Sequence, residues 1–200
     1  MPTIPLNLES DTVLLPPPSL PSQFTLEEAL KRRRSTRNFL PDELPLETLS
    51  ALLWSASGVN RPQEGGRTAP SARNWQEIDV YVVTAEGAYR YEPEAHRLLL
   101  VKAQDLRAQT GMQDFVAEAP LDLVYVADLA RMTDVSADDK PFLAGADAAF
   151  IAQNVYLYCA AAGLAAVVRA MIDRRQLAQS LDLPVNRRIM LAQTVGFARS

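Results

Sequence analysis

Apolar and polar positions follow a helical period in two early segments of the chain. Thr25 and Glu28 have the spacing of a capping box, in which each side chain accepts from the other residue's backbone N–H, and an apolar stripe of Leu26, Ala29 and Leu30 follows. Residues 45–58 also have apolar residues at helical spacing. This second helix is predicted to start at Pro45 and to end near Gly58. Both segments are predicted helices, and the first ends in a run of basic residues.

Strand-like segments dominate the rest of the chain. They are rich in β-branched and aromatic residues, and several alternate with period two. The pattern predicts strands at residues 78–84, 88–91, 98–101, 121–127, 164–168 and 188–197. Residues 121–127 are apolar on both faces, which favours a central position in a sheet. Residues 104–117 are predicted to be helical, with Pro120 ending that helix.

Residues 141–162 predict the longest helix, which is rich in alanine, apolar almost all round and closed by Gly163. Such a helix is either the spine of the core or part of a dimer interface. Asp173 and Gln176 predict the cap of a further short helix in which Leu177 and Leu181 face inward. Helices and strands do not alternate regularly, so the predicted fold class is α+β.

Prolines divide the chain into an N-terminal arm and one domain. Residues 1–22 contain six prolines, which fix extended conformations and remove hydrogen-bond donors. We expect this arm to lack regular structure and to lie along a surface, either its own or a partner subunit's. Residues 23–200 are long enough for a single domain with its own core.

Composition narrows the classes of function. Lys and Arg (20) are outnumbered by Asp and Glu (24), giving a net charge of −4 that argues against a nucleic-acid partner. No segment has the uninterrupted apolar length of a membrane span, and no signal peptide is visible. We expect a cytoplasmic protein, although an export leader already removed would leave the same sequence.

The chain contains one histidine and one cysteine, which excludes most catalytic and metal sites built from these residues. Cys159 lies inside the apolar helix and is interpreted as a packing residue. His96 falls in a polar turn and is expected at the surface. Because no side chain is an evident nucleophile or base, a cofactor would carry the chemistry of any enzyme here.

Two segments stand out as candidate sites. Residues 31–37 (KRRRSTR) hold five cations and two hydroxyls and need an anionic partner. The helix dipole explains Lys31 and Arg32 as a solvated helix-end pair, but it does not explain Arg37, which lies beyond the predicted helix end. Residues 59–76 form a long polar stretch, and loops of that length are usually functional or disordered. The hydrogen-bonding residues around Ser71 and Asn74 favour function.

Four blocks in order resemble the FMN-dependent nitroreductase family. They are residues 33–39 (RRSTRNF), 70–76 (PSARNWQ), 153–164 (QNVYLYCAAAGL) and 193–197 (QTVGF). Residues 67–72 and 88–91 further resemble the SagB-type branch of that family. The resemblance implies a nitroreductase-like fold, with a central mixed or antiparallel sheet flanked by helices and a long buried helix near a homodimer interface.

The resemblance also implies which residues bind FMN. Arg33 and Ser35 would hold the flavin phosphate, with Arg34 undecided, and Arg37 would reach the pyrimidine edge of the ring. Arg199 would replace basic residues that the family carries near its C-terminus. The other implied contacts are Pro70, Ser71, Ala72 and Asn74 across the dimer interface, Gln113 in mid-chain, and the strand end Val168, Arg169, Ala170 and Met171 through its backbone.

The activity implied by this resemblance is flavin-dependent oxidoreduction. NAD(P)H would deliver hydride to flavin N5, and a small organic acceptor such as a nitroaromatic or quinone would take it in a ping-pong cycle. One alternative is a SagB-type dehydrogenase that oxidises a peptide heterocycle. Another is a flavin-binding protein without catalysis.

Overall fold

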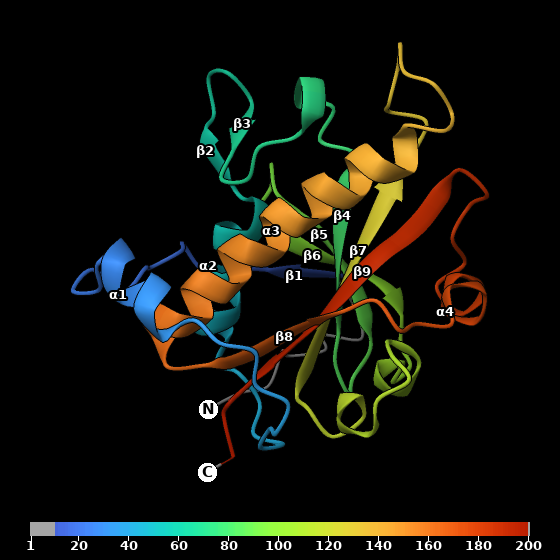
Figure 1. Cartoon of the computed structure of the whole chain (residues 1–200). Helices are drawn as coiled ribbons and strands as arrows, with labels where there is room; N and C mark the ends of the chain where they lie inside the picture. Colours follow the sequence, from blue (N-terminus) through green and yellow to red (C-terminus); the bar gives the residue numbers. More distant parts are fainter. Residues whose placement is uncertain (1–10, 200) are drawn as a thin grey trace.

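A seven-stranded antiparallel sheet is the centre of the fold in the computed structural model, which describes residues 11–199 (Figure 1). The strand order is β1-β6-β5-β4-β7-β9-β8. The strands are β1 (Thr12–Leu14), β4 (Ile78–Val83), β5 (Ala88–Glu92), β6 (Arg97–Lys102), β7 (Leu121–Asp128), β8 (Ala165–Arg169) and β9 (Arg187–Gly196). β2 (Val59–Arg61) and β3 (Gly66–Arg67) form a separate two-stranded hairpin.

Helices cover the two faces of the sheet unequally. On one face lies α3 (Lys140–Ala162), packed against α1 (Leu26–Arg32) and α2 (Leu46–Ser57) (Figure 1). The other face carries α4 (Arg174–Ser180), whose Leu177 packs on the sheet. Two single 3₁₀ turns, η2 (Arg107–Gln109) and η3 (Asp114–Val116), lie in the segment between β6 and β7.

The central strands are buried on both faces, as their composition predicts. In β4, Val80 and Val82 join the core under α2 and α3, whereas Tyr81 and Val83 join the smaller core near α4. All six β4 residues are buried. The predicted α+β class is confirmed, and so is the central position of β7.

Local sequence signals fix the helix ends. Glu28 N–H donates to Thr25 Oγ1 at 3.2 Å and Thr25 N–H donates to the Glu28 carboxylate at 3.0 Å, which confirms the capping box. Gly163 ends α3 with φ of +71°, a left-handed conformation that glycine adopts without steric cost. Asp173 Oδ1 accepts from Gln176 N–H at 3.0 Å at the start of α4, which confirms that cap.

The helix predicted at residues 104–117 is wrong. That segment contains only η2 and η3, because its polar groups bond to other parts of the fold. The Arg107 side chain donates to the Ala119 carbonyl oxygen, which lies beyond the segment. Met112 N–H donates to the carbonyl oxygen of Met171, so tertiary contacts replace the helical ladder.

Part of the N-terminal arm has regular structure, contrary to the sequence prediction. Residues 1–10 of the arm lie outside the described part of the chain. Thr12–Leu14 pair with β6 in antiparallel register as an edge strand, and Leu15 N–H donates to the His96 carbonyl oxygen at 3.2 Å. The predicted surface contact of the arm is therefore made with its own sheet.

His96 is not the exposed surface residue that its polar turn suggests. Its ring is half-buried, with Nδ1 2.8 Å from Tyr91 Oη and Nε2 2.7 Å from Ser50 Oγ. Nε2 also lies 3.1 Å from the Pro16 carbonyl oxygen in the arm. Burial lowers the pKa of His96, so its ring is neutral at pH 7 and holds the arm by neutral hydrogen bonds.

Protonation of His96 should loosen the arm. The pKa of this histidine is lower in the folded state than in the unfolded state. Its contribution to the stability of the folded arm is therefore present above the unfolded pKa of about 6.5 and is lost as pH falls through the folded pKa. Amide exchange of residues 11–15, corrected for the intrinsic rate, should speed up between pH 7 and pH 5. His96→Ala should show the fast exchange already at pH 7, whereas Ser19→Ala, in the exposed arm, should match the wild type. Equal protection of the wild-type arm at both pH values would contradict this role.

Candidate functional site

The basic signature segment runs beside the edge strand β8. Arg33 caps α1 with φ of −55° and ψ of 123°, so the chain leaves the helix in an extended conformation. Thr36 N–H then donates to the Ala166 carbonyl oxygen of β8 at 3.0 Å, and Phe39 forms an isolated antiparallel bridge with Ala198. The segment is therefore fixed to the sheet at two points.

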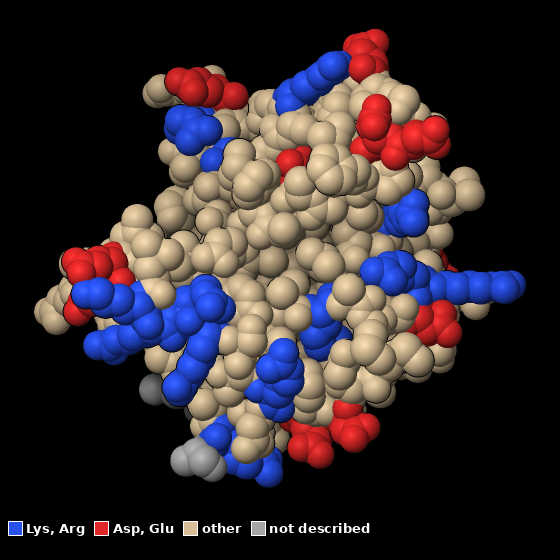
Figure 2. Space-filling view, in the orientation of Figure 1, with Lys and Arg blue, Asp and Glu red and all other residues tan. Residues whose placement is uncertain are grey.

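A hollow of about 420 Å³ opens between this segment, the C-terminal half of α3 and the start of β8. Its volume falls within the roughly 300–1,000 Å³ of small-molecule pockets. Figure 2 shows Lys and Arg side chains gathered over this end of the molecule. The lining residues are Lys31, Arg32, Arg33, Arg34, Thr36, Tyr156, Cys159, Ala160, Gly163, Leu164, Ala165, Ala166 and Ala198.

Tyr156 connects the parts of this site. Its hydroxyl lies 2.8 Å from Ser35 Oγ and accepts from Val168 N–H at 2.9 Å, and the Arg33 guanidinium lies 5.3 Å from its ring centroid. Tyr156 can thus donate its own hydrogen to Ser35, which leaves the Ser35 hydroxyl hydrogen for a bound anion. Sequence reasoning placed Tyr156 in a family motif but did not select it as a site residue.

The basic residues divide differently from the sequence prediction. Arg33 and Arg34 line the hollow as expected, but Lys31 and Arg32 line it too and are not only a solvated helix-end pair. Lys31 also pairs with Glu27, and Arg32 lies 4.6 Å from the ring centroid of Phe24.

Arg37 and Arg199 are the two remaining basic candidates. Arg37 is exposed and lies outside the lining of the hollow. Arg199 N–H donates to the Asn38 carbonyl oxygen at 3.1 Å, which brings the C-terminal segment beside the signature. This position agrees with the expected role of Arg199, whose ligand contact stays a prediction.

A second group of candidates meets at the end of β8. The hydrogen bond from Met112 N–H to the Met171 carbonyl oxygen, 3.1 Å long, brings the mid-chain segment with Gln113 to the strand end. Ala170 and Met171 are exposed. Gly111 is required here, because a Cβ atom would lie 2.0 Å from Arg169 Nη1. The structure thus brings Gln113 together with the strand end that the resemblance selects.

The Arg169 side chain is buried against the sheet. Its guanidinium donates to Asp122 Oδ1 at 2.6 Å, to Thr194 Oγ1 at 3.0 Å and to the Thr110 carbonyl oxygen at 2.7 Å. Burial raises the pKa of Asp122 to about 6, with Arg169 and Thr194 opposing the rise, so the carboxylate is ionised at pH 7. Only the backbone of Arg169 is left for a ligand, while its side chain ties Thr110 to Asp122 of β7 and Thr194 of β9.

The loop with Pro70, Ser71, Ala72 and Asn74 lies at the other end of α3. Ala72 N–H donates to Asp147 Oδ2 at 2.8 Å, and Asp147 precedes Tyr156 by nine residues, or roughly 13 Å of helix. Within one chain the structure therefore does not bring this loop to the basic hollow, as Figure 1 also shows. The loop is strained, with φ of 49°, 55° and 49° at Arg73, Asn74 and Gln76.

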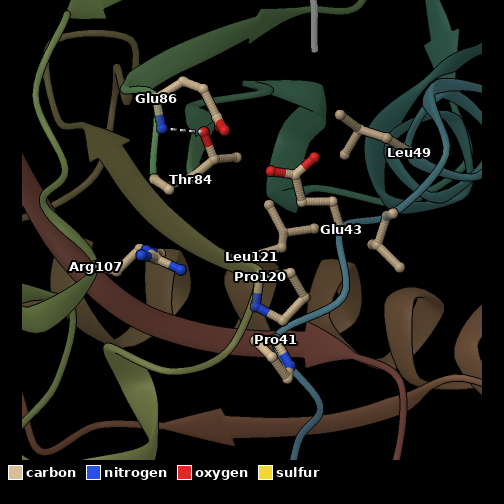
Figure 3. Close-up of a pocket in the computed structure, with 10 residues that line it drawn as sticks. Pro41, Glu43, Leu49, Thr84, Glu86, Arg107, Pro120 and Leu121 are labelled. Carbon is tan, nitrogen blue, oxygen red and sulfur yellow. Dashed lines mark hydrogen bonds between the residues drawn. The ribbon is translucent and has the colours of Figure 1, made fainter. Parts of the chain in front are cut away.

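Another hollow, of about 250 Å³, contains none of the predicted site residues (Figure 3). Glu43 and Glu86 lie at its wall with Arg107. Burial and the nearby Glu86 carboxylate raise the pKa of Glu43. Two carboxylates disfavour an anionic ligand, so the basic hollow is the better candidate for a phosphate-bearing cofactor.

Comparison with known proteins decides the family. The family model described as the Nitroreductase family matches residues 30–197, which include the basic segment, α3, β8 and β9. The chain belongs to the nitroreductase family. As a family member it is an oxidoreductase, and the predicted nitroreductase-like fold is confirmed.

Relatives of this chain cover nearly its whole length. A Methanocaldococcus jannaschii protein, provisionally named a nitroreductase, is 30% identical over 188 residues, covering 88% of this chain and 94% of that protein. A Ralstonia eutropha crystal structure, also provisionally named a nitroreductase, has a TM-score of 0.92 and 46% identity and covers 100% of this chain and 95% of that chain. A chain of the Escherichia coli microcin synthetase McbBCD complex shares the fold, with a TM-score of 0.75, 19% identity, and coverage of 100% and 83%.

The described part of the chain, residues 11–199, offers few other groups for chemistry. No cluster of three or more His, Cys, Asp or Glu residues there is placed to hold a metal ion, and no helix there is long and apolar enough to cross a membrane. Cys159 is buried and burial raises its pKa, which agrees with the predicted packing role.

Removing the acidic partner of Arg169 should destabilise the fold. Asp122→Asn leaves a buried guanidinium without a counter-charge, which typically costs about 3–5 kcal/mol. Urea unfolding at pH 7 would measure the loss. Glu27→Gln, which breaks the exposed pair with Lys31, is the control and should cost at most about 0.5 kcal/mol. Equal stabilities of the two variants would contradict the structural role of the buried pair.

Proposed function

We propose that the protein is an FMN-dependent oxidoreductase that takes hydride from NAD(P)H and passes it to a small organic acceptor. The observation that carries the proposal is the basic hollow beside β8, in a chain of the nitroreductase family. A Clostridium difficile protein with the same fold, at a TM-score of 0.63 and 17% identity, is named an FMN-dependent nitroreductase.

The donors of the hollow fit a phosphate group. Arg33 and Arg34 line the hollow with guanidinium donors. Ser35 lies between the lining residues Arg34 and Thr36 but is not itself part of the lining, and it would supply a hydroxyl oriented by Tyr156. Guanidinium groups bind phosphate oxygens through paired, charge-assisted hydrogen bonds. Arg199, tied beside Asn38, would add a further cation from the C-terminal segment.

The remaining predicted residues would lie along the rest of the cofactor. When bound, FMN exchanges hydride at N5, so the protein itself needs no nucleophile. Arg37 would place a positive charge near the pyrimidine edge, where it stabilises negative charge on the reduced ring. The exposed backbone at Ala170 and Met171 would face the ring, and Gln113 would add an amide from the neighbouring segment.

A homodimer would complete this site. The loop from Pro70 to Asn74 lies too far from its own hollow to contact a ligand there, so we assign it to the flavin of a partner subunit. Large apolar side chains on α3 support a partner on this helix, since Phe142 and Phe150 are 77% and 48% exposed.

One alternative retains specific support. The resemblance of residues 67–72 and 88–91 to the SagB-type branch favours a dehydrogenase that oxidises a peptide heterocycle. The fold shared with a chain of the microcin synthetase complex is compatible with this direction. A non-catalytic flavin-binding protein would bind FMN without turnover.

Neutralising different arginines should separate cofactor binding from flavin reactivity. Arg33→Ala should weaken FMN binding about 10- to 100-fold, because it removes a charge-assisted hydrogen bond worth about 1.5–3 kcal/mol. Arg37→Ala should lower the flavin reduction potential more than it lowers affinity. Fluorescence titration and spectroelectrochemistry measure the two quantities, with Arg188→Ala, at the exposed start of β9, as control. Failure of the wild-type protein to bind FMN at all would refute the proposed function.

The direction of the reaction can be tested anaerobically. We expect NADH or NADPH to bleach the flavin absorbance and a nitroaromatic or quinone to restore it, because the flavin would shuttle hydride between two substrates. Bleaching by a thiazoline peptide with no response to either nucleotide would favour the dehydrogenase instead. A bound flavin that responds to none of these compounds would identify a binding protein.

A further inference from the structure

The loop that we assign to the partner's flavin is held by a buried acid. Asp147 on α3 is 3% exposed, and its Oδ2 accepts the Ala72 N–H at 2.8 Å. Ser71 Oγ accepts from Gln76 N–H at 3.0 Å, which closes the loop on itself. Left-handed backbone at Arg73, Asn74 and Gln76 costs free energy, so the loop needs an anchor of this kind.

A second buried carboxyl group lies next to that anchor. Glu77 follows the loop directly, is 0% exposed, and has no hydrogen-bond partner on either carboxyl oxygen among residues 11–199. Burial, together with the neighbouring Asp147 carboxylate, raises the pKa of Glu77 to about 7. A buried carboxylate without a partner is costly, whereas a protonated Glu77 can donate its hydrogen to Asp147.

The cations near Glu77 and Asp147 do not fully neutralise these two carboxyl groups. Arg131, which follows β7, lowers the pKa of Glu77, but its guanidinium is engaged by the Gln76 carbonyl oxygen at 2.8 Å and Asp79 at 3.1 Å. Arg67 of β3 borders the small cavity of about 20 Å³ beside Asp147 and pairs with Glu94. These are the charged groups that face the pair from the surrounding elements.

We propose that Glu77 and Asp147 are positioning residues of the flavin site: protonated Glu77 donates to the Asp147 carboxylate, which holds Ala72 and so keeps the 70–76 loop in its binding conformation. The proposal rests on the proposed function, because only FMN binding gives the loop its role. The proposal adds a pH dependence of FMN binding that does not come from the arginines of the hollow.

The direction of that dependence follows from proton linkage. The closed loop keeps a proton on Glu77 up to about pH 7, whereas an open loop with a hydrated Glu77 would release it near the ordinary value of about 4.5. The equilibrium constant for loop closure is therefore largest below about pH 4.5. It falls by at most about tenfold per pH unit between about pH 4.5 and about pH 7, and it changes little above that.

Amide exchange at Ala72 tests the pair without any cofactor. In the full-length protein, the protection of this amide, corrected for the intrinsic rate, should fall at least about tenfold between pH 5 and pH 7. Glu77→Gln should keep high protection with no pH dependence, since its amide donates to Asp147 at every pH. Asp147→Asn should keep a weaker pH dependence, because burial alone still raises the pKa of Glu77, and its amide oxygen should still accept from Ala72 N–H; Asp147→Leu should lose the protection. Glu64→Gln, an exposed acid in the β2–β3 hairpin, should follow the wild type.

FMN titrations over the same pH range connect the pair to the site. The affinity for FMN should weaken from pH 5 to pH 7 more in the wild type than in Glu77→Gln. The variant provides the baseline, because the FMN phosphate ionises in the same way in both titrations. A wild-type exchange profile that Glu77→Gln leaves unchanged would overturn the inference. Loss of FMN binding in the wild type with a normal exchange profile would refute the proposed function instead.

Discussion

The attachment of the edge strand β8 is the constraint on which the rest of the site depends. On its open edge, Ala166 accepts from Thr36 N–H, and Val168 N–H is capped by the Tyr156 hydroxyl. On one face, the Arg169–Asp122 pair ties it to β7. An edge strand normally leaves such groups unpaired. In β8 these hydrogen bonds and the buried ion pair fix the basic segment and the mid-chain segment on either side of one strand.

This attachment explains how an acidic protein maintains a strongly basic hollow. The cations from Lys31 to Arg34 come from one helix end, where their mutual repulsion is reduced by the helix dipole and by Glu27. They converge because Thr36 and Phe39 fix the following chain to the sheet. The charge is therefore concentrated by the backbone path and not by overall composition.

Buried charge serves two different purposes in this fold. Arg169 and Asp122 form a pair whose hydrogen-bonding groups are largely satisfied by Thr110 and Thr194, so the pair mainly fixes geometry. Glu77 and Asp147 are two neighbouring buried carboxyl groups that would repel each other if both were ionised, so this arrangement depends on a proton on Glu77. The first pair supports the strand end inside one subunit. The second supports the loop that we assign to the neighbouring subunit.

The sequence by itself determined the elements with strong local signals and the family. The capping box at Thr25, the apolar α3 closed by Gly163 and the doubly apolar β7 are set by short-range rules, which the structure follows. Tertiary structure alone decided the 3₁₀ turns around Gly111, the pairing of β1 and the burial of His96, because hydrogen bonds to distant residues outweigh weak local preferences there. It also decided that Tyr156 and Ser35 meet across 121 residues and that Glu77 lies beside Asp147. No local pattern encodes such contacts, since they depend on how the helices and strands pack.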